Sequence, residues 1–295
     1  MQNHVLFLGN GLNDVTNQYK WKDLIKDLMS WLGITSPIDI EKVPFPLLYE
    51  EIYLSSLKRK IVDEYRLKSF IAEKVNQIEP NEVHKRISTL GFSNILTTNY
   101  DHIIENALGF EHKDIDNKGK VKESLYSVFR HTQMNGTQIW HIHGEINSPN
   151  TILLGYEQYS GQLQHIRNYI VSGTGNIYKS FRSPSLFSLI KKGQVNSNSW
   201  LDLFFTQNIH IVGLTLDFIE SDLWWLITYR ARMKLEKKLP IKNSITYYYP
   251  GNFERGIQVK LEMFSANEIL TEPISNEHDL SYYQKVFDYI EKNTR

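Results

Sequence analysis

The sequence predicts an α/β protein built on a mostly parallel, doubly wound sheet. Two observations lead to this fold class. Short apolar runs of the kind that form buried strands alternate with longer segments whose apolar residues recur at helical spacing. Several of these runs also end in glycine or in polar side chains just before a helix, and polar residues at the carboxyl ends of strands are where open α/β sheets bind ligands.

The first predicted unit is a strand, a tight loop and a helix. The apolar run HVLFL at residues 4–8 is closed by Gly9 and Gly11. In YKWKDLIKDLMSWLG, residues 19–33, apolar side chains repeat every three or four positions, which predicts an amphipathic helix. Residues 45–90 follow with a helical and charge-rich pattern.

The alternation then continues through the middle of the chain. FSNILTTNY at residues 92–100 predicts a strand, and DHIIENALG at residues 101–109 predicts a helix that Gly109 ends. Turn-forming residues separate three further short strands, which are predicted at SLYSVFRH (124–131), TQIWHIHG (137–144) and NTILLG (150–155).

The last third of the chain begins with a helical stretch at residues 156–205 that polar segments interrupt. NIHIVGLT at residues 208–215 returns to a buried strand, and a long amphipathic helix is predicted at residues 219–238. A strand at SITYYYP, residues 244–250, and a helix near residues 281–293 complete the pattern.

These elements predict one domain over residues 1–295. The sheet and its covering helices would occupy residues 1–44, 91–155 and 206–295. The two helical stretches at residues 45–90 and 156–205 would be additions to that core.

Composition limits the classes of function. The chain has 295 residues, with 33 Lys and Arg against 33 Asp and Glu, so its net charge does not indicate nucleic-acid binding. It contains no cysteine, which excludes disulfides and thiolate zinc sites. No apolar stretch approaches the roughly 20 residues of a membrane span. We therefore expect a soluble cytoplasmic protein.

The motif TTNYD, residues 97–101, places polar side chains at the end of a predicted strand. Burying such groups without partners is costly, so they are expected to face a ligand. The Asn99 carboxamide can donate and accept hydrogen bonds. Asp101 has a simpler explanation as the N-cap of the following helix, because Asp is a favoured capping residue.

The loop FLGNG allows two interpretations. Gly9 and Gly11 would let backbone N–H groups approach a phosphate at the start of a helix. The third glycine of the dinucleotide-binding fingerprint is missing, because Asp14 takes its place. A tight turn without a ligand explains the two glycines equally well.

The motif HIHGE places His141, His143 and Glu145 on one face of a predicted strand. Such a set can ligate a metal, and Gly144 would leave room for a ligand beside His143. Histidines in strands are also commonly structural residues with hydrogen-bond partners. A later strand ends similarly in GLT, residues 213–215.

Taken together, the glycine pair followed by Trp21, the TTNYD motif, the His-Gly pair and the GLT motif resemble the SIR2-like domains of bacterial anti-phage defence proteins. The resemblance implies a Rossmann-like fold and a catalytic role for His143, with Asn99 and Asp101 beside it. It also implies that a further set of residues borders the nucleotide, namely Gly9, Asn10, Gly11, Asn13, Thr98, Gly213 and Thr215.

The chain also departs from the sirtuin pattern. Its first loop carries Asn10, Asn13 and TNQYK where the family usually has an alanine, a serine and a Gly-Ile-Pro-like stretch. Sirtuin deacylases carry a zinc module with four cysteines, which a chain without cysteine cannot form. The resemblance therefore implies the branch that consumes NAD+, and it disfavours protein deacylation.

We expect an NAD+ glycohydrolase that releases nicotinamide and ADP-ribose in anti-phage, abortive-infection defence, with NAD as substrate and no metal. Asn99 would hold water and ribose hydroxyls, His143 would be a general base, and Asp101 would orient them. Two alternatives remain: a subunit that senses NAD or ADP-ribose without turnover, and a metal-dependent nuclease or hydrolase on His141, His143 and Glu145. The resemblance also implies a homo-oligomer and a HerA-type hexameric ATPase partner, and the aromatic-rich helix at residues 219–238, with Trp224 and Trp225, would supply a contact surface.

Overall fold

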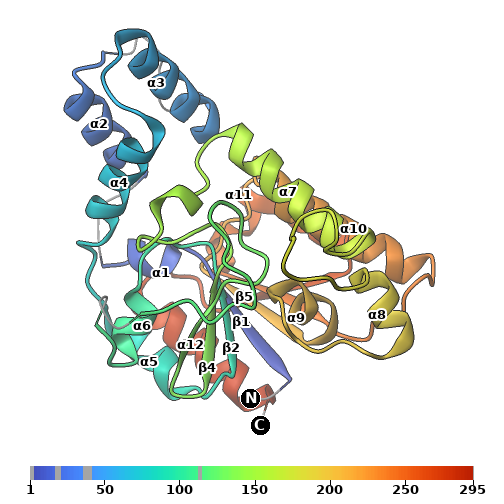
Figure 1. The fold of residues 1–295 in the computed structure, drawn as a ribbon. Coiled ribbons are helices and arrows are strands. Elements are labelled where there is room, and N and C mark those ends of the chain that lie inside the picture. The colour runs from blue at the N-terminus through green and yellow to red at the C-terminus, as the bar shows by residue number, and fades with distance from the viewer. Residues whose placement is uncertain (1–2, 17–20, 36–41, 112–114, 295) are drawn as a thin grey trace.

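The computed structural model describes residues 3–16, 21–35, 42–111 and 115–294. A seven-stranded sheet in the order β3-β4-β2-β1-β5-β6-β7 forms its centre (Figure 1). All neighbouring strands are parallel except β3, which pairs antiparallel with β4 at one edge. The strands are β1 (His4–Leu8), β2 (Asn94–Thr97), β3 (Thr132–Met134), β4 (Thr137–His141), β5 (Asn208–Val212), β6 (Ile245–Tyr249) and β7 (Ile269–Pro273).

Helices cover both faces of the sheet, which confirms the predicted Rossmann-like fold class. The α-helices are α1 (Gly11–Asp14), α2 (Trp21–Leu32), α3 (Phe45–Arg59), α4 (Glu64–Val75), α5 (Glu82–Thr89), α6 (Ile103–Ala107), α7 (Tyr156–Val171), α8 (Leu186–Lys192), α9 (Trp200–Thr206), α10 (Ser221–Leu235), α11 (Glu254–Ala266) and α12 (Leu280–Thr294). Two 3₁₀ turns are η2 (Pro149–Thr151) and η3 (Gly251–Phe253).

The alternation of side chains along β1 divides the core into two layers. Val5 and Phe7 point into a cluster completed by α7 to α11. Leu6 and Leu8 point into the opposite cluster with α1, α5, α6 and α12. Successive strand residues face opposite sides of a sheet, so a strand buried on both faces is apolar throughout. This explains why HVLFL is an unbroken apolar run.

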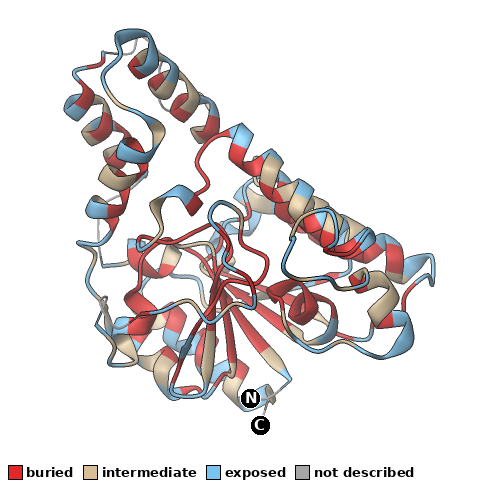
Figure 2. Cartoon of the chain, viewed as in Figure 1, coloured by how far each residue is buried: buried red, intermediate tan, exposed pale blue. Residues whose placement is uncertain are grey.

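Helices α2, α3 and α4 form an arm that projects from the sheet body (Figure 1). The arm has its own apolar cluster, in which Leu28 and Ile52 are fully buried. Tyr100 and Ile152 belong to the same cluster, so the arm rests on loops near the carboxyl ends of the strands. In Figure 2 buried and exposed positions alternate along these helices, as amphipathic packing requires. Residues 19 and 20 of the predicted first helix lie outside the described residues.

The predicted strand at residues 124–131 is wrong, because this segment is an irregular loop and β3 begins only at Thr132. The carboxylate of Glu123 accepts hydrogen bonds from the backbone N–H groups of Val128, Phe129 and Arg130, at 2.8–3.0 Å. A side chain thus satisfies the donors that a neighbouring strand would otherwise take. The apolar residues are buried without entering the sheet.

The predicted strand at residues 150–155 is wrong for a similar reason. Leu153 donates its N–H to the carbonyl of His143 at 2.9 Å, and Leu154 donates to the side chain of Gln158 at 3.1 Å. Residues 150 and 151 belong to η2, and residues 152–154 are buried, but their partners lie in a loop and in a helix. Helix α11 and strand β7 were not predicted from the sequence. No helix in the described ranges is long and apolar enough to cross a membrane.

Candidate functional site

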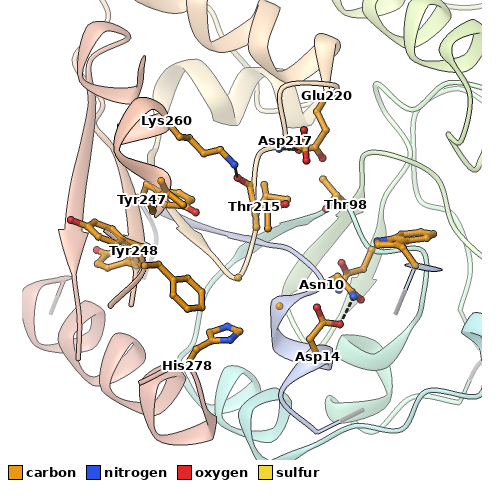
Figure 3. Close-up of a pocket in the computed structure, with 18 of the residues that line it drawn as sticks. Asn10, Asp14, Thr98, Thr215, Asp217, Glu220, Tyr247, Tyr248, Lys260 and His278 are labelled. Atoms are coloured by element: carbon orange, nitrogen blue, oxygen red, sulfur yellow. Dashed lines mark hydrogen bonds between the residues drawn. The ribbon is translucent and has the colours of Figure 1, made fainter. Parts of the chain in front are cut away.

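A pocket lies at the carboxyl ends of the central strands, where the strand order reverses. β1 has β2 on one side and β5 on the other. The first half of the chain therefore adds its strands on one side of β1, and the second half adds its strands on the opposite side. Open α/β sheets bind ligands at such a switch point. The cavity here measures about 370 Å³, within the usual range of small-molecule sites (Figure 3).

Most of the residues predicted for the site line this one pocket, although they come from four separate loops. The lining includes Asn10, Gly11, Thr98, Asn99, His143, Gly213 and Thr215. Gly9, Asn13 and Asp101 are not among the lining residues, but they adjoin them in the sequence or contact them through hydrogen bonds. The structure thus brings the motifs together, while their roles in binding and catalysis remain predictions.

The glycine loop packs against the loop after β5. The N–H of Gly9 donates to Val212 O at 3.1 Å, and the N–H of Gly11 donates to Gly213 O at 2.8 Å. A Cβ on Gly9 would lie only 2.5 Å from Leu214 Cα. The two glycines therefore serve close packing of loops, and their N–H groups are already used. This differs from the phosphate-facing N–H groups that the sequence analysis considered.

Asn13 links Asp101 to the pocket wall. Its Nδ2 donates to Asp101 Oδ2 at 3.0 Å and to Asn10 Oδ1 at 2.9 Å. Asp101 is buried, and its Oδ1 accepts the N–H of Ile103 at 3.1 Å. Burial raises the pKa of Asp101, although these hydrogen bonds act against the rise. Helix α6 begins one residue later than a cap at Asp101 would require, with His102 as its N-cap.

Asn99 is held mainly through its backbone, which leaves its carboxamide available to the pocket. Its N–H donates to Thr97 Oγ1 at 3.0 Å, and its carbonyl lies 2.8 Å from His141 Nδ1. The side-chain Nδ2 is 3.5 Å from Gly9 O, at the limit of a hydrogen bond. The amide can therefore turn toward a ligand at little cost.

His143 is buried, and its Nε2 lies 3.0 Å from Asp222 Oδ2 at the start of α10. Burial of the ring lowers the pKa of His143, but the Asp222 carboxylate outweighs it, so the pKa lies above the ordinary value. Asp222 was not among the residues predicted from the sequence. An added Cβ at Gly144 would lie 2.2 Å from Thr151 O, so this glycine allows the close approach of the neighbouring backbone.

Glu220 is a second acidic residue that the sequence analysis missed, and it lines the pocket. Burial raises the pKa of its carboxyl to about 7, which the nearby His143 opposes and Asp222 reinforces. At neutral pH this group is therefore divided between its two protonation states. The other end of the pocket is aromatic and carries the amine of Lys260, with Tyr247 and Tyr248 beside it (Figure 3).

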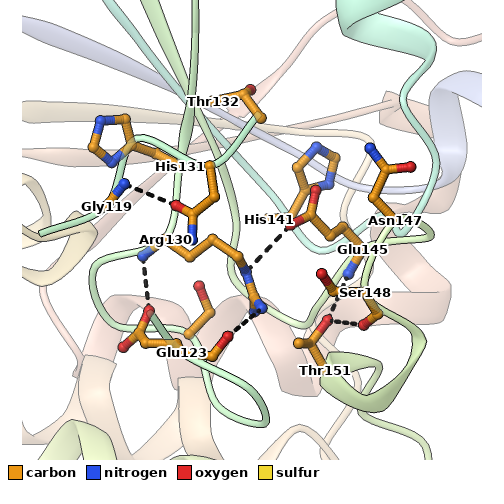
Figure 4. A network of polar contacts seen from close by, with 12 residues as sticks. Gly119, Glu123, Arg130, His131, Thr132, His141, Glu145, Asn147, Ser148 and Thr151 are labelled. Atoms are coloured by element: carbon orange, nitrogen blue, oxygen red, sulfur yellow. Dashed lines mark hydrogen bonds and ion pairs between the residues drawn. The ribbon is translucent and has the colours of Figure 1, made fainter. Parts of the chain in front are cut away.

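His141 and Glu145 do not join His143, contrary to the expectation of three side chains on one strand face. β4 ends at His141. His141 Nε2 lies 2.9 Å from Glu105 Oε1, and Glu145 pairs with His102 at 3.0 Å and with Arg130 at 3.4 Å (Figure 4). His141, His143 and Glu145 therefore each bind a different partner and do not converge on one point.

Within the described residues, the group that could hold a metal is instead His102, Glu105 and His141, whose ligand atoms lie within 4.8 Å of one another. Burial lowers the pKa of His141, but Glu105 raises it to about 9 overall. His141 is thus a cation beside the Glu105 carboxylate, and Arg130 compensates Glu145. This buried network is balanced in charge by its own side chains.

Comparison with known proteins supports the resemblance seen in the sequence. Residues 93–188 match the model of the SIR2-like domain family. This segment contains Asn99, Asp101 and His143 and ends before Asp222. The resemblance to SIR2-like domains is confirmed over these residues.

Curated relatives carry the name NAD(+) hydrolase ThsA. The one from Acinetobacter baumannii (strain 532279) is 24% identical over 210 residues, which cover 66% of this chain and 40% of the relative. The one from Enterococcus faecium is 24% identical over 234 residues, which cover 78% and 42%. The one from Cytobacillus dafuensis is 25% identical over 170 residues, which cover 58% and 32%. These alignments span well under half the length of the relatives.

Proposed function

We propose that this protein is an NAD+ glycohydrolase that cleaves the bond between nicotinamide and ribose. The observation that carries the proposal is the convergence of Asn99 and His143 on one pocket at the switch point of the sheet. They come from the ends of different strands, β2 and β4, within the segment that matches the SIR2-like family. The relatives named NAD(+) hydrolase support the same reaction.

The residues fit the chemistry of this cleavage. Departure of neutral nicotinamide leaves an oxocarbenium-like centre on the ribose, so the site must mainly position the sugar and a water molecule. The Asn99 carboxamide would hold the water and the ribose hydroxyls. His143 would accept a proton as general base, a role usually worth about 10²–10⁴-fold in rate. Thr98, Gly213 and Thr215 would border the rest of the nucleotide.

The direct test is to incubate the purified protein with NAD+ and to measure nicotinamide by chromatography. We expect release by the parental protein and none by His143→Ala. His165→Gln is the matched control, because His165 is a half-buried histidine on α7 that bonds Gly161 O and lies outside the pocket. Binding of NAD+ without release would favour the sensing subunit, and loss of activity with a chelator would favour the metal-dependent hydrolase.

We also propose that the activity serves anti-phage defence by depleting NAD+ in infected cells. The support is the resemblance to SIR2-like defence proteins. Expression of the parental chain and of His143→Ala in phage-challenged bacteria tests it. Protection and a fall in cellular NAD+ should both require His143, and protection that the variant retains would contradict the proposal.

We also propose a homo-oligomer, but we place its contact surface on α3 and no longer on the helix that carries Trp224 and Trp225. Trp224 stacks on Phe264 and Trp225 stacks on Tyr229, so both rings pack within the chain. One side of α3 exposes three large apolar side chains, which are each 45–51% exposed: Leu47, Leu54 and Leu57. We expect this side to contact another copy.

The HerA-type ATPase partner is proposed from the resemblance alone. Light scattering at micromolar protein, with and without such an ATPase, tests both assemblies. A mass of 34.6 kDa for the chain alone, unchanged after addition of the ATPase, would contradict both.

A further inference from the structure

The buried pair of His143 and Asp222 joins two parts of the chain that are 79 residues apart. His143 follows β4, and Asp222 is the second residue of α10. The distance between His143 Nε2 and Asp222 Oδ2 is 3.0 Å, and the two residues are 2% and 0% exposed. The sequence around Asp222 reads as an ordinary acidic helix start.

Among the described residues, the side chain of Asp222 has one hydrogen-bond partner, the ring of His143. Its second oxygen, Oδ1, is buried and has no hydrogen-bond partner among the described residues. A buried carboxylate is costly unless a partner compensates it, and here the imidazole of His143 is that partner. The start of α10 adds a favourable helix dipole. The fold thus holds a carboxylate in the interior against one nitrogen of the predicted base.

We propose that Asp222 is the positioning residue of the reaction. Its Oδ2 accepts the Nε2–H of His143 and fixes the imidazole tautomer whose Nδ1 is free of hydrogen. Nδ1 has no hydrogen-bond partner in the described part of the chain, and His143 lines the pocket. Nδ1 is therefore the nitrogen that can take a proton from the substrate water. This inference rests on the proposed function.

In the proposed step, water adds to C1′ of the ribose as nicotinamide leaves. The O–H bond of water breaks and its proton goes to Nδ1, while the oxygen bonds to C1′ of the ribose. The bond between C1′ and the nicotinamide nitrogen breaks, and its electron pair leaves with neutral nicotinamide. His143 becomes an imidazolium, and the carboxylate of Asp222 stabilises that charge.

Two other titratable groups face His143. Glu220 precedes α10 and interacts electrostatically with the imidazole, and the ring of Tyr159 on α7 meets it edge-on at 5.5 Å. Glu220 Oε2 accepts the N–H of Asp217 at 2.8 Å, so this carboxyl has a partner of its own. The hydrogen bond to Nε2 belongs to Asp222, and the positioning role is assigned to it alone.

The first experiment compares Asp222→Asn with the parental protein. We expect kcat to fall by about 10²–10⁴-fold while KM for NAD+ changes little, because the base is misoriented and substrate contacts remain. The acidic limb of the pH profile should move to lower pH, because removing the carboxylate lowers the pKa of His143. Asp222→Glu, which keeps the charge, should recover part of the activity. Unchanged kcat and pH profile in folded Asp222→Asn would overturn the proposal.

Asp202→Asn is the matched control. Asp202 is another buried aspartate near the start of a helix and is 1% exposed. Its Oδ1 accepts a hydrogen bond of 2.8 Å from the hydroxyl of Tyr169, and neither residue lines the pocket. This variant should keep the parental kcat per folded molecule. An equal loss in both variants would assign the effect to general destabilisation and overturn the role of Asp222.

The second experiment does not depend on activity. Nitrogen-15 NMR of the histidine rings, with His143→Gln to assign the signal, should show the proton on Nε2 in the parental protein. In Asp222→Asn the pKa of the same ring should fall. A ring with the same tautomer and pKa in both proteins would overturn the proposal. If these NMR changes occur but the parental protein releases no nicotinamide, the proposed function fails while the His143–Asp222 pair stands.

Discussion

His141 Nδ1 lies 2.8 Å from the backbone carbonyl oxygen of Asn99, while its Nε2 lies 2.9 Å from Glu105 Oε1. A charged imidazole donates from both nitrogens, so it can make both hydrogen bonds at once. The ring therefore ties the turn after β2 to α6 and fixes the backbone from which the Asn99 carboxamide projects. His141, first considered as a metal ligand, supports the site from behind.

This ion pair predicts a pH dependence of stability. Burial lowers the pKa of His141, but Glu105 raises it to about 9 in the folded protein, against 6.5 ordinarily. A raised histidine pKa stabilises the fold fully below pH 6.5, and the contribution disappears as pH rises toward 9. The loss should be about 3 kcal/mol in the free energy of unfolding.

Denaturant unfolding between pH 6 and pH 9 measures this contribution. The double variant Glu105→Gln, His141→Gln removes both charges and retains the remaining titratable groups, whose effects cancel in the comparison. Its unfolding free energy should fall less steeply over this range. If the free energy of unfolding changes with pH in the same way in both proteins, His141 and Glu105 do not form the charged pair described here.

Asn99→Ala should abolish nicotinamide release, by at least about 10²-fold, with little effect on stability. The side chain makes one hydrogen bond at the limiting distance of 3.5 Å, so its loss removes little from the fold. The backbone bonds to Thr97 and His141 survive the substitution. Thermal unfolding and nicotinamide assays on the same preparation check both parts, and near-parental turnover in the folded variant would remove Asn99 from the site.

The strands that flank the pocket could be predicted because they are buried on both faces. β1, β2 and β5 are mostly apolar and buried over most of their length, and glycine or polar residues lie at their carboxyl ends, which marks both their type and their functional end. β7 gave no such signal, because it is a partly exposed edge strand. α11 buries only Leu261 and Phe264, too few to produce a helical period.

The site could be predicted only as far as local motifs reach. Asn99 and His143 stand in short motifs at strand ends, so residue type and position identified them together. Asp222 and Glu220 lie at the start of a helix, where acidic residues are common for reasons of capping and dipole. Only the packing of α10 against the loop after β4 distinguishes them. A single sequence contains no signal for that contact.

Asp101→Asn should separate helix capping from support of the pocket. The new side chain can still accept the Ile103 N–H, but its amide would meet Asn13 Nδ2, and both groups are donors. We expect a loss of about 1–2 kcal/mol in stability and a moderate loss of activity through displacement of Asn10.

Asp63→Asn provides the comparison for this substitution. Asp63 caps α4 through the Arg66 N–H at 2.8 Å and is exposed, and Asn caps about as well as Asp. The free energy of unfolding, measured by chemical denaturation, and the rate of nicotinamide release should both be close to the parental values in this variant. If Asp101→Asn behaves in the same way, Asp101 only supports the start of α6 through the Ile103 N–H and has no further role in the pocket.

Gly144→Ala should destabilise the protein more than a glycine substitution elsewhere, because two costs combine. Gly144 has φ +98°, which L-residues rarely adopt, and an added Cβ would lie 2.2 Å from Thr151 O. Gly136 in the turn between β3 and β4 has φ +85° but open space around it, so Gly136→Ala carries the backbone cost alone. We expect a loss of about 1–2 kcal/mol for Gly136→Ala and more than about 3 kcal/mol for Gly144→Ala.

Unfolding by denaturant measures both losses, and activity provides an independent check. The clash with Thr151 would push the loop that carries His143 away from Asp222, so Gly144→Ala should also lose activity per folded molecule. Gly136 lies at the far end of β4 from His143, and its variant should retain activity. Equal stability of the two variants would mean that the loop moves without cost. The position of His143 would then not depend on the tight packing of Gly144 against Thr151.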